Sequence, residues 1–184
     1  MKNLSWHQRR MQASSLKLWG CSVMWNLEDG IFIPETKTQG LFKVRVIYGP
    51  DTFRQQIIPY TFRPVASLKL VIADHLDYPL KYADRREIDN LFSMRESCDD
   101  VLMVKQGLIT DTSYANVLLF DGEYWFTPKY PLLAGTKREQ LLFKGNIREA
   151  DIRPEDLQDF SEVRIINAMI DFDDSPGFSV DSII

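Results

Sequence analysis

Four stretches of the 184-residue chain carry side chains that could do chemistry together. Arg10 lies on an early amphipathic segment, Lys81 follows an extended Tyr-Pro-Leu, and Asp111 stands among apolar strand residues. The fourth stretch places Gly135 before Thr136 at an expected helix start. A phosphate-bearing aldehyde cofactor with a ring nitrogen needs an anion cradle, an amine and an acid. The order of these groups along the chain is more informative than any one of them.

Each stretch also has a simpler interpretation. An arginine on an amphipathic helix is usually solvated, an aspartate just beyond Gly107 can belong to a turn, and a capped helix needs no ligand. A lysine forms a Schiff base only when its amine is neutral part of the time, which requires burial or nearby cations. Leu80, Tyr82 and Arg85 would supply these conditions for Lys81 if the segment faced inward.

The segment "LLAGTKREQLL" has the features of an anion-binding helix start. Thr136 is followed three residues later by Glu139, the spacing of a capping box. Gly135 lets the backbone approach a ligand closely. The free amides at a helix N-terminus bind anions, phosphate among them. Lys137 and Arg138 add positive charge, so this segment is the expected phosphate site.

The elements that must position these groups form a mixed, α+β chain. The first part, residues 1–75, is expected to be a small α+β domain. Its expected elements are a helix over 4–19 that ends at Gly20, a strand over 41–49 closed by the turn at 49–51, and strands over 53–62 and 67–73.

Residues 76–184 are expected to form a larger domain, reached through the polar, proline-containing segment 73–79. Hairpin turns at 106–107 and 121–122 indicate mostly antiparallel pairing. The expected elements are helices within 84–96, 135–145 and 153–160, and strands over 100–105, 108–120, 123–128 and 162–170. The acidic tail that begins at Asp171 is expected to be a solvated end rather than part of a site.

Composition excludes several classes of protein. Hydrophobic residues make up 45% and charged residues 26%, as in globular proteins that bury a core. A net charge of −4 argues against nucleic acid as a partner, and the apolar runs are too short to span a bilayer. The start lacks the apolar region of a secretory signal. Cys21 and Cys98 show no paired spacing, which favours a reduced, cytoplasmic protein. Two histidines, His7 and His75, exclude a histidine-rich metal site but leave a Ser-His-Asp triad possible.

Taken together, the motifs resemble the class IV family of pyridoxal-phosphate enzymes, which includes branched-chain and D-amino acid aminotransferases and 4-amino-4-deoxychorismate lyase. The segment "HQRRM" resembles the family's His-x-x-Arg helix, and "PLKYADRREID" resembles the lyase form of the Schiff-base segment. "ITDTSYAN" resembles the strand motif that ends in asparagine, here Asn116. "LLAGTKREQLL" resembles the phosphate-binding helix start, and "VRIINAM" resembles a pocket strand of the lyase. The resemblance covers nearly the whole chain.

The resemblance implies a role for each matched residue. Lys81 would form the Schiff base with pyridoxal 5′-phosphate and move protons, and Asp111 would hold the proton on the pyridine nitrogen. The other cofactor contacts implied are Arg10, Gly135, Thr136 and Lys137 at the phosphate, Arg85 near the phenolic oxygen, Leu133 against the ring, and Asn167 and Ala168 along the same pocket. No metal site is implied.

The resemblance also implies two domains with the cofactor in the cleft between them, in a homodimer with a shortened N-terminal segment. Lyase activity that yields 4-aminobenzoate and pyruvate for folate synthesis is the favoured activity. A branched-chain or D-amino acid aminotransferase, or an inactive cofactor-binding module, are the alternatives. Two departures from the family pattern stand out: Asp111 replaces a glutamate, and Gly-Thr-Lys-Arg replaces Gly-Ile-Thr-Arg.

Overall fold

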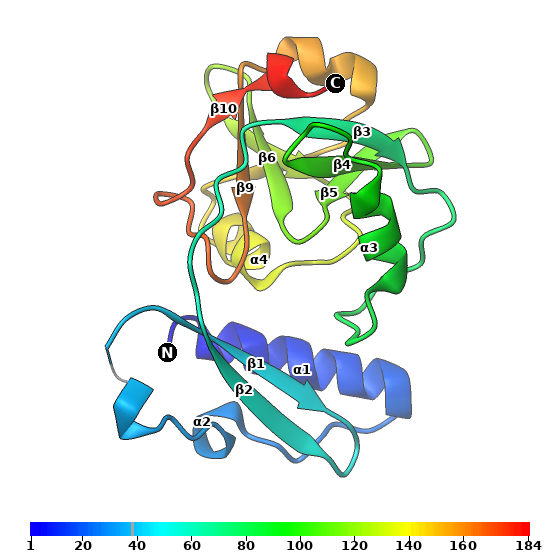
Figure 1. The fold of residues 1–184 in the computed structure, drawn as a ribbon. Coiled ribbons are helices and arrows are strands. Elements are labelled where there is room, and N and C mark those ends of the chain that lie inside the picture. The colour runs from blue at the N-terminus through cyan, green and yellow to red at the C-terminus, as the bar shows by residue number, and fades with distance from the viewer. Residues whose placement is uncertain (38) are drawn as a thin grey trace. The chain divides into compact units, whose positions relative to one another are not determined.

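The boundary between Arg63 and Pro64 divides the protein into two compact units. The computed structural model describes residues 1–37 and 39–184 (Figure 1). The boundary lies before the strand β3 (Leu68–Ile72) rather than at residue 75, because β3 pairs in parallel with β4 (Asp100–Lys105) of the second unit. The strand expected to end the first domain therefore begins the second.

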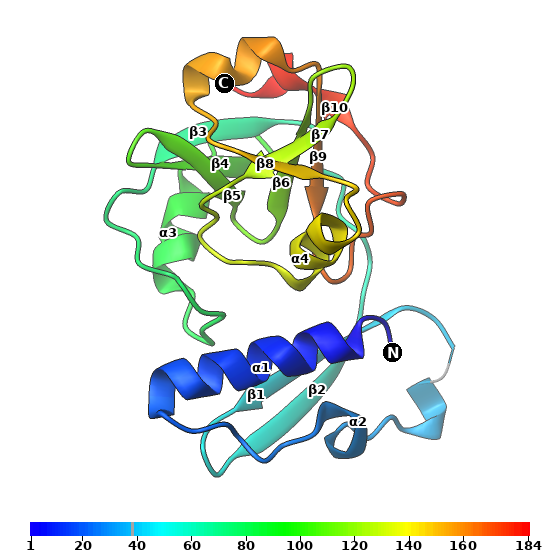
Figure 2. The same ribbon diagram turned by 180° about the vertical axis from the view of Figure 1, so that it is seen from behind.

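The first unit consists of one long helix and a two-stranded sheet. The helix α1 (Leu4–Trp19) ends where Gly20 adopts a positive φ of 70°, as the sequence predicts. The strands β1 (Phe42–Tyr48) and β2 (Phe53–Pro59) pair antiparallel (Figure 2). Met11 of α1 belongs to a buried core cluster against which Val46 and Phe53 pack. Two short helices were not predicted, α2 (Leu27–Gly30) and η1 (Glu35–Lys37).

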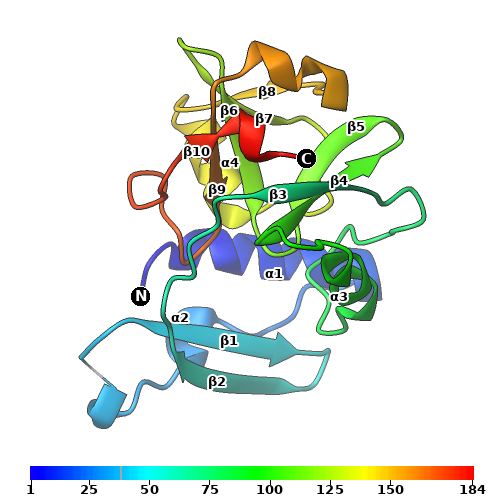
Figure 3. The ribbon, with the colours of Figure 1, turned by 45° about the horizontal axis from the view of Figure 1, so that its top comes forward.

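The second unit is built on a mostly antiparallel sheet, which Figure 3 shows with the top of the molecule tilted toward the viewer. Its path runs β10-β9-β6-β5-β4-β3, with β7 paired to both β6 and β8. The strands not yet given are β5 (Leu108–Thr112), β6 (Asn116–Phe120), β7 (Trp125–Pro128), β8 (Arg148–Ala150), β9 (Glu162–Ile166) and β10 (Phe178–Ser179). The helices are α3 (Arg86–Ser93), α4 (Thr136–Phe143), η2 (Pro154–Asp159) and η3 (Val180–Ser182).

The prediction of one continuous strand over 108–120 is wrong, because the chain turns at residues 113–115. Thr112 stabilises this turn: its backbone N–H donates to the Ala115 carbonyl at 3.0 Å, and its hydroxyl accepts from the Ala115 N–H at 3.1 Å. The resulting hairpin places Asp111 of β5 directly opposite Asn116 of β6. This pairing brings two buried polar side chains, Asp111 and Asn116, next to each other inside the second unit.

The C-terminal tail is part of the fold, contrary to the expectation of a solvated end. The strand β10 pairs with β9, and the Ile184 backbone exchanges hydrogen bonds with Leu68 and Leu70 of β3. Ser175 is buried and donates to the Ile165 carbonyl at 2.8 Å. Within residues 1–37 and 39–184, no helix is both long enough and apolar enough to cross a membrane.

Leu118 lies at the centre of β6 and is completely buried against Leu141, Ile147 and Ile166. We expect Leu118→Ala to lower the free energy of unfolding by about 3 kcal/mol, because it leaves a cavity between β6 and α4. Phe143→Ala, on a side chain that is 82% exposed at the end of α4, should change it by less than about 0.5 kcal/mol. Urea unfolding of both variants measures the difference, and equal losses would contradict this core assignment.

Candidate active site

The carboxylate of Asp111 is buried and held from two sides. Its Oδ1 accepts from the Asn116 side-chain amide at 2.7 Å, and its Oδ2 accepts from the Leu133 backbone N–H at 2.9 Å. The Asn116 amide also donates to the Leu133 carbonyl at 2.9 Å. A strand residue, its hairpin partner and the loop before α4 are therefore joined in one polar cluster.

Gly135 is required by the position of Asn116. A Cβ atom added at Gly135 would overlap the Asn116 Oδ1 atom. The backbone of Gly135 has φ −72° and ψ 140°, which any residue can adopt, so the requirement is steric rather than conformational. The missing side chain lets the start of α4 approach the Asp111–Asn116 pair.

Burial raises the pKa of Asp111 to about 6. The hydrogen bonds from Leu133 and Asn116 and the positive charge of Arg138 lower it, but they do not overcome the loss of water around the carboxylate. A carboxylate has about four acceptor sites, so the bonds from Asn116 and from the backbone of Leu132 and Leu133 leave Asp111 able to accept one further hydrogen bond. Such a group can pair with a cationic ring nitrogen.

The helix α4 begins at Thr136, with Gly135 as its N-cap residue. The predicted capping box is therefore wrong, because Thr136 is the first helical residue rather than the cap. Gly135 instead accepts the first backbone bond, from the Glu139 N–H at 2.9 Å. The amides of the first turn remain oriented toward the N-terminal end, where an anion would be stabilised.

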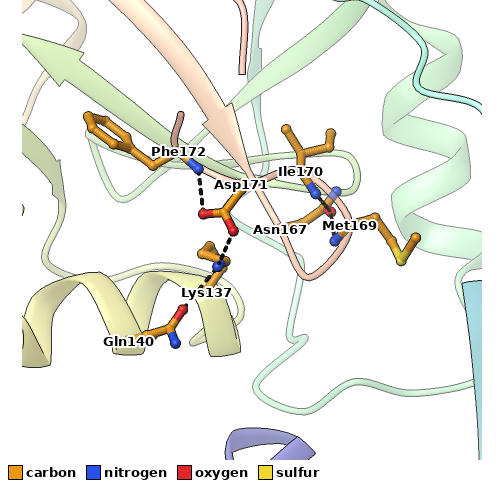
Figure 4. A network of polar contacts seen from close by, with 7 residues as sticks. All are labelled: Lys137, Gln140, Asn167, Met169, Ile170, Asp171 and Phe172. Atoms are coloured by element: carbon orange, nitrogen blue, oxygen red, sulfur yellow. Dashed lines mark hydrogen bonds and ion pairs between the residues drawn. The ribbon is translucent and has the colours of Figure 1, made fainter. Parts of the chain in front are cut away.

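The two cations that follow Thr136 are buried and paired with acids. Lys137 contacts Asp171 at 3.0 Å (Figure 4), and Arg138 contacts Glu149 of β8 at 2.6 Å. Arg138 also donates to the Pro128 carbonyl at 2.7 Å. At this helix start, Lys137 thus offers its backbone amide, while its ammonium group is directed to Asp171.

Asn167 and Ala168 follow β9 in a tight turn. The Asn167 Oδ1 accepts from the Met169 and Ile170 N–H groups at 2.7 and 3.1 Å. Its Nδ2 donates to the Tyr114 carbonyl at 3.4 Å, so the turn is tied to the β5–β6 hairpin. Ala168 is half-buried at the tip of this turn.

Lys81 lies in the loop between β3 and α3, where it is exposed. Its backbone is ordered by its neighbours: the Tyr82 N–H donates to the Leu80 carbonyl at 2.9 Å, and the Tyr78 hydroxyl donates to the Tyr82 carbonyl at 2.9 Å. Arg85 donates to the Ser113 carbonyl at 2.8 Å. The lysine loop is therefore attached to the turn that follows Asp111.

The structure thus connects most of the predicted residues within the second unit. Asp111, Leu133 and Gly135 share one cluster, and Arg85 and Asn167 both bind carbonyls of the β5–β6 turn. Arg10 belongs to the first unit, where it is half-buried on α1. Sequence reasoning does not identify Tyr78, or Asp171, which it places in the acidic tail. The only sequence signal for Asp171 is its place just after the "INAM" motif.

The donor set fits a phosphorylated pyridine aldehyde. Asp111 could hold a protonated ring nitrogen, and the amides at the start of α4 could hold the phosphate. Gly135 lets the start of α4 lie close to the Asp111–Asn116 pair, so that both parts of the donor set come from adjoining segments. Lys81 could supply the amine that reacts with the aldehyde. Its loop is attached to the turn after Asp111 by the hydrogen bond from Arg85 to the Ser113 carbonyl.

Comparisons with known proteins agree with this chemistry. Residues 79–172 match the sequence model of the class IV aminotransferase family. An uncharacterized protein of Haemophilus influenzae is 37% identical over 171 residues, covering 92% of this chain and 91% of that protein. A crystal structure from Haemophilus somnus, named as a candidate 4-amino-4-deoxychorismate lyase, is 35% identical with a TM-score of 0.84, covering 91% of this chain and 89% of that one.

A third comparison shows a similar fold with the cofactor bound. A hypothetical aminotransferase of Mycobacterium tuberculosis in a pyridoxal-phosphate-bound form has a TM-score of 0.69 at 19% identity, covering 90% of this chain and 72% of that one. The chain belongs to the class IV aminotransferase family. It is a pyridoxal-phosphate-dependent enzyme of that family. The predicted family, fold class and cofactor are confirmed.

Asp111 should make stability depend on pH. Its folded-state pKa of about 6 lies above the ordinary 3.8, so the folded protein binds this proton more tightly than the unfolded chain. Ionisation of Asp111 therefore lowers the free energy of unfolding. This loss is absent below pH 3.8 and reaches about 3 kcal/mol above pH 6. The free energy of unfolding should therefore fall more between pH 4 and pH 7 in the wild type than in Asp111→Asn. Urea unfolding at both pH values tests this, and parallel curves would contradict it.

Gly135 and Asn116 should be energetically coupled. Gly135→Ala should lower the free energy of unfolding by about 1–3 kcal/mol, because the new Cβ displaces the Asn116 side chain. In an Asn116→Ala background the same change should cost less than about 0.5 kcal/mol, since the overlapping atom is gone. A double-mutant cycle by urea unfolding measures the coupling. Equal costs in both backgrounds would show that the contact does not determine the choice of glycine.

Proposed function

We propose that this enzyme is a 4-amino-4-deoxychorismate lyase that releases 4-aminobenzoate and pyruvate. The observation that carries the proposal is the 35% identity, over nine-tenths of the chain, to the Haemophilus somnus structure of that name. The sequences "LKYADR" and "INAM", which resemble the lyase form of two family motifs, support it. The reaction breaks the ether bond between the ring and the enolpyruvyl group, and the ring becomes aromatic.

Lys81 is assigned the central role. When bound, pyridoxal phosphate supplies an aldehyde that reacts with amines and a ring that draws electrons from the attached carbon. Between substrate turnovers Lys81 would hold the aldehyde. During turnover its amine would accept the proton from the ring carbon that carries the amino group, and would return a proton to the methylene carbon of the departing pyruvate. The ordered loop around Tyr78 and Tyr82 supports such a fixed position.

The remaining residues would hold the cofactor. Asp111 keeps the ring nitrogen protonated, and Asn116 and Leu133 orient that carboxylate. The phosphate end is assigned to the start of α4, at Gly135, Thr136 and the Lys137 backbone amide. The family resemblance also assigns Arg10, on α1 of the first unit, as a phosphate contact. Leu133 would lie against the ring, Arg85 near the phenolic oxygen, and Asn167 and Ala168 along the pocket wall. The donor set at α4 and the buried Asp111 support these roles.

The proposal includes a cytoplasmic homodimer. The resemblance to class IV enzymes supports the dimer, and the two unpaired cysteines, Cys21 and Cys98, agree with a reducing compartment.

Incubation of the pyridoxal-phosphate-loaded protein with aminodeoxychorismate should yield 4-aminobenzoate and pyruvate in equal amounts. Lys81→Ala should lower the rate at least about 10²-fold, because general acid–base catalysis contributes about 10²–10⁴-fold. Lys129→Ala removes an exposed lysine of the same unit and should leave the rate unchanged. Chromatography of the aminobenzoate and a coupled pyruvate assay give the two rates.

Two other results would contradict the lyase assignment. Transfer of an amino group from branched-chain or D-amino acids to 2-oxoglutarate, without aminobenzoate formation, would identify an aminotransferase. Binding of the cofactor without turnover of any amine would identify an inactive binding module.

A further inference from the structure

Lys137 is a lysine whose charged group is almost completely buried. Its side chain is 5% exposed, and its Nζ donates to Asp171 Oδ2 at 3.0 Å and to Gln140 Oε1 at 2.9 Å. Figure 4 shows the ammonium group between the carboxylate of Asp171 and the amide of Gln140. Asp171 is 36% exposed, so the pair lies at the edge of the unit's interior.

A buried cation in the first turn of a helix is unfavourable by itself. It loses water, and it faces the positive end of the helix dipole. The sequence at this position departs from the family pattern, which has threonine where Lys137 stands. The cost is offset by the partner carboxylate of Asp171, 34 residues further along the chain. The pair therefore connects two segments that no backbone pairing joins at these residues.

The segment that carries Asp171, residues 167–172, is held by side-chain hydrogen bonds at both ends. At its start, the Asn167 side chain binds two backbone N–H groups of its own turn and the Tyr114 carbonyl. At its end, Asp171 Oδ1 accepts from the Phe172 N–H at 2.9 Å while Oδ2 binds Lys137. Residues 167–172 thus form a loop fixed to the β5–β6 hairpin on one side and to α4 on the other.

We propose that the Lys137–Asp171 ion pair is a latch that holds the 167–172 loop against the start of α4 and so shapes the pocket for the phosphate end of the cofactor. The proposal rests on the phosphate site assigned above and goes beyond it, since it adds Asp171 as a positioning residue. Lys137 acts through Asp171 and not by direct contact of its ammonium group with the phosphate.

A latch and a direct contact between Lys137 and the phosphate predict opposite changes in ligand affinity for the variant Asp171→Asn. Asp171→Asn frees the Lys137 ammonium from its counter-charge. If that ammonium bound phosphate directly, affinity for a phosphorylated ligand would rise. If the pair is a latch, the loop loosens and affinity falls. If the pair is a latch, the substitution should hardly change the affinity for ligands that lack a phosphate group.

The probes are pyridoxine 5′-phosphate and pyridoxine, which lack the aldehyde and so report binding independently of Lys81. Calorimetry on the cofactor-free protein should give about 10-fold weaker binding of pyridoxine 5′-phosphate for both Asp171→Asn and Lys137→Met. The double variant should lose no more than about 2-fold further, because either single change already opens the latch. Pyridoxine binding should stay within about 2-fold, and Lys137→Arg should restore most of the phosphate preference. Glu96→Gln, which breaks the Lys69–Glu96 pair of the same unit, is the matched control and should change nothing.

Hydrogen exchange of the cofactor-free protein tests the latch without any ligand. The amides of residues 167–172 should exchange at least about 10-fold faster in Asp171→Asn and Lys137→Met than in the wild type or Glu96→Gln. Unchanged exchange, or tighter binding of pyridoxine 5′-phosphate by Asp171→Asn, would overturn the latch. Wild-type protein that binds no pyridoxine 5′-phosphate would overturn the cofactor assignment and the phosphate role of the latch together. The exchange data distinguish that result from failure of the latch alone.

Discussion

The buried carboxylate of Asp111 is the constraint on which the rest of the site depends. A carboxylate removed from water must receive hydrogen bonds, and the donors come from two other segments, Asn116 on β6 and the Leu133 backbone. The hairpin must turn at residues 113–115 to bring Asn116 opposite Asp111, and Gly135 must lack a side chain for the loop to approach. One polar interaction thus determines the hairpin, the loop and the start of α4.

The start of α4 extends this polar framework through paired charges. Arg138 connects the helix to Glu149 on β8 and to the Pro128 carbonyl, and Lys137 connects it to Asp171. Because both cations form ion pairs with carboxylates of the protein, the anion-binding capacity of this end resides chiefly in its backbone amides. A class IV enzyme needs such a fixed frame, since its cofactor must be held at the ring nitrogen and at the phosphate while one amine moves protons.

The sequence was most informative where the signal is local. The helix over 4–19 and its end at Gly20 were predicted as observed, because the periodic pattern and the glycine lie next to each other. The turn at 113–115 was missed because Ser113, Tyr114 and Ala115 contain no glycine or proline to mark it. The capping box at Thr136 has the right spacing, but the helix begins at Thr136 itself, one residue earlier than that motif requires.

Local sequence patterns do not predict contacts between residues that are far apart in the chain. Nothing in the run of acids after Ile170 distinguishes Asp171, which pairs with a buried lysine, from Asp173 and Asp174, which are exposed. The boundary between the units also depended on such a pair, since β3 joins a strand that begins almost thirty residues after it ends. The family motifs supply part of what local patterns lack, because they assign Asp111, Leu133 and Gly135 to one site, and the structure joins these residues in one cluster.

The most direct test of the central claim is to find which amine carries the cofactor. The protein would be incubated with pyridoxal phosphate, reduced with borohydride, digested and mapped by mass spectrometry. We predict a yellow protein before reduction and one stoichiometric pyridoxyl adduct on Lys81 after it, with none in Lys81→Ala. An adduct distributed over surface lysines, or a single adduct on another lysine, would contradict the assignment of Lys81 as the catalytic amine.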